Sequence, residues 1–179
     1  MKIRNSSMQL TRAADYAVRV MVHLVGQPEG TRASLVSLSE ATAAPESFLS
    51  KVLQALTRAG MIYSQRGQSG GFEISQPGRK ASMLEVIEAI GGPVRLNVCL
   101  ASGKSCVRKV WCPAHPVWVR AQEAMLEVLR KTSIAELAAQ ASNGGARWTE
   151  ADCESDASMQ DAPAADGEKT PELSIAPGR

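Results

Sequence analysis

The chain has 179 residues, of which 44% are hydrophobic and 4% aromatic, so it can bury one core of ordinary size made mainly of aliphatic side chains. Residues 1–141 hold 17 Lys and Arg against 10 Asp and Glu, whereas residues 142–179 hold 3 against 8. No run of about eighteen apolar residues occurs, and residues 17–25 are interrupted by Arg19 and His23, which excludes a membrane span and a secretory signal. We therefore expect a cytoplasmic protein with a basic folded part and no membrane partner.

The first half of the folded part predicts three helices. Apolar positions recur at helical spacing over residues 10–25, until Pro28 and Gly30 stop the run. Ser34 is placed to cap a short second helix that ends near residue 42. Pro45 suits the first position of a third helix, which Gly60 ends. This order is typical of a helix-turn-helix.

The third helix has the composition of a DNA recognition helix. Its inward positions are Leu49, Val52, Leu53 and Leu56, and its outward side carries Ser47, Ser50, Lys51, Gln54 and Arg58. Base edges are read by hydrogen bonds and phosphates are held by positive charge, so this outward side suits the major groove. A solvated helix face has the same composition, and the segment by itself does not separate the two interpretations.

A glycine-rich loop from Arg66 to Gly71 lies between two strand-like runs, residues 61–65 and 72–75, and predicts a β-hairpin wing. An arginine on such a loop can enter a narrow minor groove, and glycine lets the backbone approach the phosphates. Arg66 and Gly67 are therefore candidate DNA contacts. The loop lacks the glycine spacing and the Lys-Ser/Thr of a P-loop, which argues against a phosphate-binding enzyme.

Three more helices are predicted, over residues 82–90, 116–131 and 133–140. In the long middle helix, apolar side chains recur at three- and four-residue steps, namely Trp118, Ala121, Met125 and Val128, widened by Val117, Ala124 and Leu129. Such a face predicts a partner helix, and small DNA-binding domains normally act as dimers on paired half-sites, so we expect a homodimer. Packing of this face on its own domain is the alternative. The tail from residue 142 onwards has no sustained period and is predicted to be disordered.

Three cysteines and a histidine follow one another in the spacing Cys-x6-Cys-x5-Cys-x2-His, as Cys99, Cys106, Cys112 and His115. In a reducing compartment, clustered thiols bind metal or react with oxidants rather than form structural disulfides. The tight Cys-x2-Cys pair of zinc ribbons is absent, and wide spacings suit a cluster whose irons are separated. An iron–sulfur cluster is therefore favoured over zinc. Cys153 stands apart in the tail and receives no role.

Taken together, these motifs resemble the IscR/NsrR type of winged-helix transcription regulators, the Rrf2 family. The resemblance covers residues 8–141. Its carriers are Met8-Gln-Leu-Thr11, Asp15-Tyr16-Ala17-Val18, Ser47-Phe-Leu-Ser-Lys-Val-Leu53, Leu56, Arg58-Ala-Gly60, Arg66-Gly67, Gly70-Gly71, Glu85-Val86-Ile87 and the three cysteines. Each motif alone is weak, but jointly they are specific.

The resemblance implies a homodimer that binds a palindromic promoter element, with one 2Fe-2S or 4Fe-4S cluster per subunit setting the DNA affinity. It also implies that the three cysteines are ligands, that Ser47 and Arg66 contact DNA and that residues 116–131 form the dimer. Two residues are candidates for the fourth ligand. His115 follows the last cysteine as in the biogenesis regulators, and Asp15 matches a carboxylate that nitric-oxide-sensing members supply across the dimer. The start of a helix keeps a histidine neutral, which favours His115.

Two features depart from the family pattern. The first gap between cysteines is one residue longer than in the biogenesis regulators, and Ser50 stands where some members have a glutamate that tunes base preference. The operator sequence therefore cannot be carried over from the family.

The sequence thus predicts a mainly α fold with a small β-hairpin wing, that is, a winged helix-turn-helix plus a long dimerisation helix. The expected segments are an extension (1–7), the DNA-binding domain (8–92), a cluster-binding loop (93–115), the dimerisation and C-terminal helices (116–141) and a disordered acidic tail (142–179). The predicted function is non-enzymatic: a repressor on double-stranded promoter DNA that responds to iron–sulfur or iron status, nitric oxide or redox stress. The alternatives are a metal-free thiol-redox regulator and a zinc-stabilised module that docks a partner enzyme.

Overall fold

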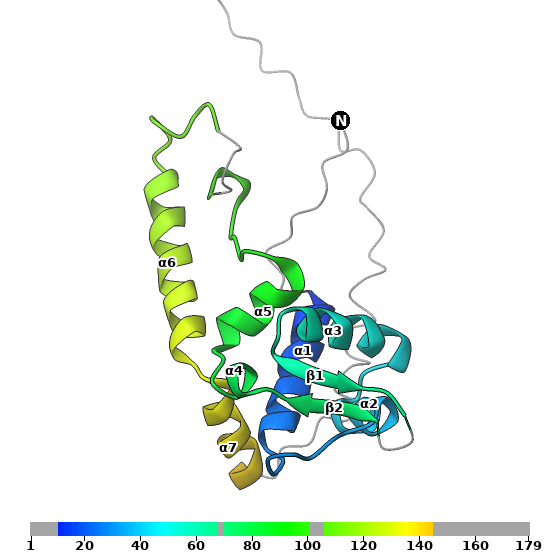
Figure 1. Ribbon diagram of the computed structural model, residues 1–179. Coiled ribbons are helices and arrows are strands. Elements are labelled where there is room, and N and C mark those ends of the chain that lie inside the picture. Colours follow the sequence, from blue (N-terminus) through cyan, green and yellow to red (C-terminus); the bar gives the residue numbers. More distant parts are fainter. Residues whose placement is uncertain (1–10, 68–69, 101–105, 145–179) are drawn as a thin grey trace, which may run out of the picture. The chain divides into compact units, whose positions relative to one another are not determined.

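The computed structural model describes residues 11–67, 70–100 and 106–144. The fold is mostly helical, with one antiparallel hairpin (Figure 1). Its elements are α1 (Arg12–Val25), α2 (Leu35–Thr42), α3 (Glu46–Arg58), β1 (Ile62–Gln65), β2 (Gly71–Ile74), α4 (Gln76–Arg79), α5 (Met83–Gly91), the 3-10 turn η1 (Val98–Leu100), α6 (His115–Lys131) and α7 (Ile134–Gly144). The predicted extension lies outside the described residues, as does the predicted tail beyond residue 144.

Helix α1 lies at the centre of the fold and contacts α2, α3, α5 and α7. Its start is fixed by Thr11, whose Oγ1 accepts a hydrogen bond from the amide of Ala14 at 3.3 Å. The core around it is aliphatic, as the composition predicts. Its largest fully buried hydrophobic side chains are Val20, Met21, Leu24, Leu38, Leu49, Leu53, Leu56, Ile62, Val86 and Ile134.

The predicted helix-turn-helix is confirmed in α2 and α3. Ser34 caps α2 by accepting from the amide of Ser37 at 3.1 Å. The turn to α3 passes through Ala43 in the left-handed region, with φ of 50°, and Ser39 Oγ fastens it by donating to the carbonyl of Ala44 at 2.7 Å. Pro45 is the cap residue of α3 rather than its first helical residue, so α3 begins one position later than predicted.

The predicted wing is confirmed in β1 and β2, which pair Ile62 with Ile74 and Gln65 with Gly71. The segment before α2 joins the hairpin, because Ala33 exchanges two backbone hydrogen bonds with Phe72, at 3.0 and 2.9 Å. Gly71 makes this approach possible, since a Cβ there would lie 2.8 Å from the carbonyl oxygen of Ala33. The base of the wing is thus anchored to the segment that leads into α2.

Helices α5 and α7 begin side by side. The bridge between Ser82 and Ser133 holds them together, with hydrogen bonds from the amide of Met83 to the carbonyl of Thr132 (2.9 Å) and from the amide of Ile134 to the carbonyl of Ala81 (3.0 Å). Helix α7 runs to Gly144, beyond the predicted end at residue 140, so residues 142–144 are helical where disorder was predicted. The buried side chain of Ile134 anchors its first turn in the core.

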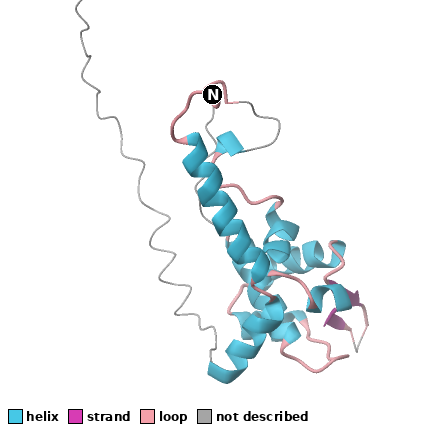
Figure 2. Cartoon of the chain, turned by 90° about the vertical axis from the view of Figure 1, so that its left-hand side faces the viewer, coloured by secondary structure: helices cyan, strands magenta, loops and turns pink. Residues whose placement is uncertain are grey.

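Helix α6 is the longest element and begins at His115, one residue before the predicted start. It packs on α5 and η1, and Figure 2 shows its upper half extending past the end of α5. None of its 17 residues is buried. No helix in the described part of the chain is long and apolar enough to cross a bilayer.

Candidate nucleic-acid interface and metal centre

The polar side of α3 faces away from the core. Leu49, Val52, Leu53 and Leu56 are buried against the rest of the domain, as predicted. On the opposite side Ser47, Lys51 and Gln54 are exposed and Ser50 is half-buried. The candidate DNA-contact residues of α3 therefore lie together on the outward side, where hydroxyl, amide and ammonium groups can meet base edges and phosphates.

A cluster of Tyr16, Arg19 and Phe48 packs the first turn of α3 against α1. The ring of Phe48 meets Tyr16 of α1 edge to face, with centroids 6.1 Å apart. The guanidinium of Arg19 lies 5.7 Å from the Tyr16 ring centroid, and its Nη1 donates to the carbonyl of Thr42 at 3.3 Å. Helix α1 thereby stabilises both the turn and the start of α3.

The cluster contains one functional candidate that sequence analysis missed. Phe48 is 48% exposed and borders the polar side of α3. An exposed aromatic ring there can contact the methyl group of thymine or a sugar. Its position beside Ser47 on the predicted recognition helix was the available signal, but its apolar character pointed to the core.

Arg66 and Gly67 directly follow β1 and are both exposed, at the loop of the wing. Gly67 has φ of +114°, and its carbonyl accepts a hydrogen bond from the amide of Gly70 at 2.9 Å. Arg66 forms no ion pair within the described residues, so its guanidinium is available for a phosphate or a groove. Helix α3 and the wing contact each other through β1, so the two predicted DNA-contact elements belong to one assembly (Figure 1).

The three predicted cysteine ligands are free thiols and are all half-buried. Cys99 lies in η1, whereas Cys106 and Cys112 lie in the turns before α6. The amide of Lys109 donates to the carbonyl of Cys106 at 2.9 Å, and the amide of His115 donates to that of Cys112 at 3.1 Å. These turns direct the chain from the cysteines into α6.

His115 has an unsatisfied group. Its Nε2 is buried and has no hydrogen-bond partner in the described structure. A buried imidazole nitrogen without a partner is costly, and a metal ion would satisfy it. Soft thiolates with one imidazole match the donor set of iron–sulfur and zinc sites. The described residues do not bring three or more such groups into one metal-binding group, so the fit rests on the donor chemistry and on this nitrogen.

Asp15, the other predicted fourth ligand, is already engaged within its own chain. Its Oδ2 lies 2.7 Å from Nη2 of Arg19, one turn later on α1. The carboxylate is 53% exposed, whereas the guanidinium is 13% exposed. Ligation of a metal by Asp15 would have to compete with this ion pair.

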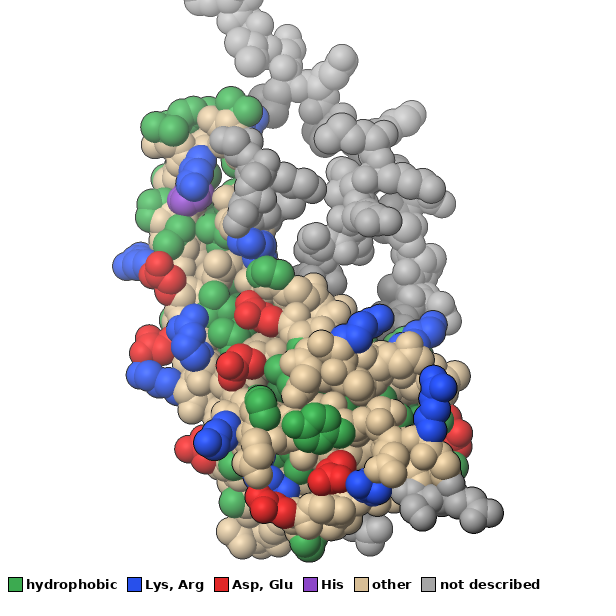
Figure 3. Space-filling view, in the orientation of Figure 1, with side chains coloured by type: hydrophobic (Ala, Val, Ile, Leu, Met, Phe, Trp, Pro, Cys, Tyr) green, Lys and Arg blue, Asp and Glu red, His purple; other side chains and the backbone are tan. Residues whose placement is uncertain are grey.

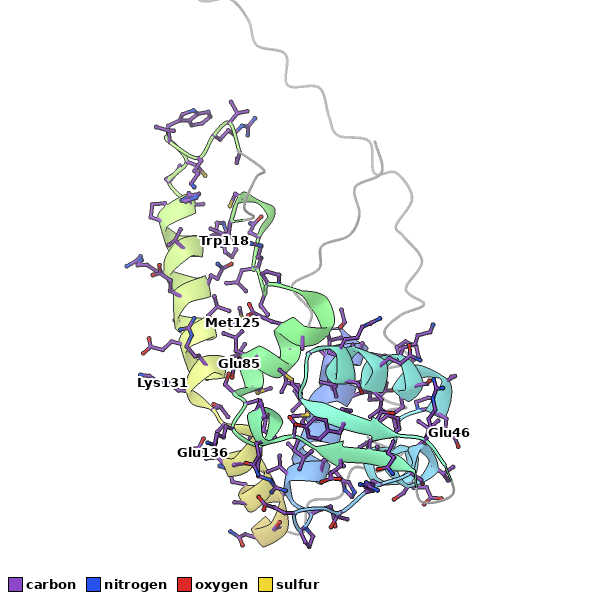
Figure 4. The ribbon with its side chains drawn as sticks, viewed as in Figure 1. Glu46, Glu85, Trp118, Met125, Lys131 and Glu136 are labelled. Carbon is purple, nitrogen blue, oxygen red and sulfur yellow. The ribbon has the colours of Figure 1, made fainter. Side chains whose placement is uncertain are left out.

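The apolar face predicted for α6 is largely uncovered. Val117 is 53% exposed, Trp118 37% and Val128 65%, whereas Met125 and Leu129 are half-buried. Figure 4 shows Trp118 and Met125 on one side of the helix and Lys131 on another. The turn before α6 adds Val107, Val110 and Trp111, which are 90%, 96% and 68% exposed. Exposed apolar surface of this extent on one element is typical of an interaction site.

The chain is similar to known regulators over most of the described residues. A family model described as "Rrf2: Iron-dependent Transcriptional regulator" matches residues 10–140. A protein of Mycobacterium tuberculosis named as HTH-type transcriptional regulator Rv1287 is 31% identical over 131 residues, which cover 73% of this chain and 81% of that protein.

Two solved structures share the fold. An oxidized form of CymR from Staphylococcus aureus is 26% identical, with a TM-score of 0.56, and the match covers 73% of this chain and 95% of CymR. IscR from T. potens is 20% identical, with a TM-score of 0.61, and the match covers 79% of this chain and 93% of IscR. The winged helix-turn-helix architecture predicted from the sequence is thereby confirmed.

Proposed function

The chain belongs to the Rrf2 family of helix-turn-helix transcriptional regulators, a non-enzymatic family, and from that premise we propose that it is a repressor whose affinity for promoter DNA is set by an iron–sulfur cluster. The proposed signals are iron–sulfur or iron status, nitric oxide or redox stress. The observation that carries the proposal is the set of three free, half-buried cysteines with the unpartnered Nε2 of His115, placed between the DNA-binding domain and α6.

In the proposed complex α3 lies in the major groove of double-stranded DNA. Ser47, Ser50 and Gln54 would donate to or accept from base edges, and Lys51 would neutralise a phosphate. Arg66 would enter the adjacent minor groove, where the narrow walls concentrate negative potential. Gly67 would let the wing backbone approach the phosphates. The basic excess of residues 1–141 supports this polyanionic partner.

The proposed repressor is a homodimer formed through α6. Val117, Trp118 and Val128 are exposed in the single chain, and a second copy of the helix would cover them. Two DNA-binding domains would then meet two half-sites of a palindromic operator.

Cys99, Cys106 and Cys112 would hold the cluster as thiolates, with His115 as the fourth ligand and Asp15 of a second copy as the alternative. When bound, the cluster supplies a centre that reacts with oxidants and nitric oxide. His115 opens α6, and Cys99 lies in η1, which contacts α6. The ligands would therefore attach the metal centre to the same helix that would form the dimer. A change in the cluster could then shift α6 and alter the distance between the two DNA-binding domains.

The proposal is tested by anaerobic purification of the full chain. We expect a brown protein with visible absorbance that contains iron and sulfide, and operator affinity that changes when the cluster is removed. A colourless protein with stoichiometric zinc would refute the iron–sulfur assignment and favour the zinc-held interaction module.

A metal-free thiol-redox regulator is the second candidate. The similarity to CymR, one of whose solved structures is described as an oxidized form, favours it, together with the free thiols of this chain. In that case the protein would lack iron and zinc, and its DNA affinity would respond to oxidation and recover with a reducing thiol.

A further inference from the structure

A cavity of about 450 Å³ lies between α5 and α6, outside the DNA-contact surface and the cysteine loop. Its volume falls within the range of about 300–1,000 Å³ that small-molecule sites occupy, but it is a cleft open to solvent and its lining is largely polar. Two leucines and four charged residues contribute to its lining, namely Leu84, Leu126, Lys80, Glu85, Glu88 and Arg130. Figure 3 shows acidic side chains over α5 and side chains of both charges along α6 on this side of the molecule.

The charged groups of the cavity are of opposite sign but do not pair. Within the described residues, no ion pair includes the side chains of Lys80, Glu85, Glu88 or Arg130. Lys80, Glu85 and Arg130 are exposed and Glu88 is half-buried, so water screens these charges and each group remains free to contact a ligand. A cavity that keeps two cations and two carboxylates separated can receive a ligand that carries both charges.

The carboxylates are held in place by hydrogen bonds to the backbone. Glu85 Oε2 accepts from the amide of Ser82 at 2.7 Å and from its Oγ at 2.8 Å, as part of a capping box. Glu88 Oε1 accepts from the amide of Val94 at 3.3 Å. Figure 4 shows Glu85 on the side of α5 that faces α6. The acidic wall is therefore preorganised, and Glu88 retains a second oxygen for a ligand.

We propose that this cavity binds a small apolar α-amino acid: its carboxylate contacts Arg130 and Lys80, its ammonium group contacts Glu88, and its side chain packs between Leu84 and Leu126. Arg130 supplies the fork of donors that suits a carboxylate. Both charges of the ligand meet opposite charges, and the leucines favour an apolar side chain over a polar one.

The site would let the protein respond to a second signal, a bound amino acid, independently of the metal centre. Leu84 and Glu88 belong to α5 of the DNA-binding domain, whereas Leu126 and Arg130 belong to α6. Helix α6 contacts α5 but buries no residue of its own, so a ligand that contacts both helices would add to the packing between them. Amino-acid binding would thus stabilise one placement of α6 on α5.

The test is calorimetric titration of the full-length protein, without DNA, with L-leucine, L-methionine and L-valine. Two leucine analogues separate the charges: 4-methylpentanoate lacks the ammonium group and 3-methylbutylamine lacks the carboxylate. We expect L-leucine to bind at least about tenfold more tightly than either analogue, because each analogue leaves one pair of charged groups unused. Absence of binding by all three amino acids would overturn the proposal, as would equal binding of the analogues.

Variants assign the contacts. Arg130→Ala and Glu88→Gln should each weaken L-leucine binding by roughly tenfold or more. Arg120→Ala is the matched control, because it removes an exposed arginine from the same helix without touching the cavity lining. An equal loss in Arg120→Ala and Arg130→Ala would show that the effect is general electrostatics and would refute the site. If Arg130→Ala misfolds, the analogue comparison on the unmodified protein still decides the proposal.

Discussion

Arg66 is the residue on which the wing's contribution to DNA binding depends. Arg66→Ala should weaken operator binding by about 1–3 kcal/mol, because a guanidinium in a narrow minor groove is lost, while the visible spectrum of the protein stays unchanged. Fluorescence anisotropy with a labelled operator measures this. Arg120→Ala on α6 is the control and should bind DNA normally. Unchanged affinity in Arg66→Ala would remove the wing from the interface.

The fourth cluster ligand can be assigned by comparing two residues. His115→Ala should bleach or destabilise the cluster as strongly as Cys112→Ala, because the orphaned Nε2 would be replaced by a methyl group. Asp15→Ala should leave the spectrum unchanged, because the carboxylate is engaged by Arg19. Anaerobic absorbance and iron content of the three variants measure the outcome. The reverse pattern would assign the ligand to Asp15 of a second copy.

At the scale of elements, the capping box at the start of α5 makes stability depend on pH. Hydrogen bonds from the backbone and the side chain of Ser82 lower the pKa of Glu85 below its ordinary value of 4.5. A group with a lowered folded pKa contributes stability above its unfolded pKa, and the contribution is lost as pH falls through the folded pKa. Glu85→Ala should therefore destabilise the protein by about 1 kcal/mol at pH 7 and by progressively less below pH 4.5.

Urea unfolding followed by circular dichroism at pH 7, 4.5 and 3.5 measures the effect of Glu85→Ala. Glu123→Ala is the matched control, because Glu123 is exposed on α6 and caps no helix. A difference between Glu85→Ala and the unmodified protein that stays constant with pH would contradict the linkage to the Glu85 carboxylate.

The uncovered face of α6 predicts a second helical partner. Val128→Lys should yield monomers, because an ammonium group would be placed in an apolar seam, whereas the fold of the single chain should persist because Val128 is 65% exposed. Sedimentation velocity measures the oligomeric state. Glu123→Lys adds the same side chain at an exposed, already charged position of the helix and should remain dimeric. A Val128→Lys dimer of normal stability would refute the α6 interface.

Helix boundaries were predictable where side chains act locally. Ser34 caps α2 as predicted, and the buried leucines of α3 follow its apolar period. Helix α5 begins at Met83, one residue after the predicted start, because Ser82 is its cap. Helix α4 was missed because four residues are too short to establish a period. The helical residues 142–144 were missed because small side chains at the end of α7 carry little apolar signal, while the turn that anchors its start lies ten residues earlier.

At the scale of the whole molecule, what escaped prediction was spatial association between distant segments. The strand-like pairing of Ala33 with Phe72 joins segments almost forty residues apart, and the hydrophobic pattern of neither segment predicts it. The cavity between α5 and α6 escaped for the same reason, because Glu88 and Arg130 are brought to its lining by the fold. The brace on α3 was likewise invisible, since Tyr16 and Phe48 each look like ordinary core residues.

Local stability must vary widely across this molecule, as the burial of α1 and α6 shows. Eight residues of α1 are buried, whereas none of α6 is, and most of the stability of a helix in a protein comes from the packing of one face. In a single chain, the backbone amides of α6 should exchange with deuterium orders of magnitude faster than those of α1, because opening α6 breaks only its contacts with α5 and η1 and exposes no buried side chain. Exchange mass spectrometry over a dilution series measures this. If protection of the α6 amides rises with protein concentration, its extent reports the fraction of chains that are assembled. Protection equal to that of α1 at every concentration would contradict the expectation.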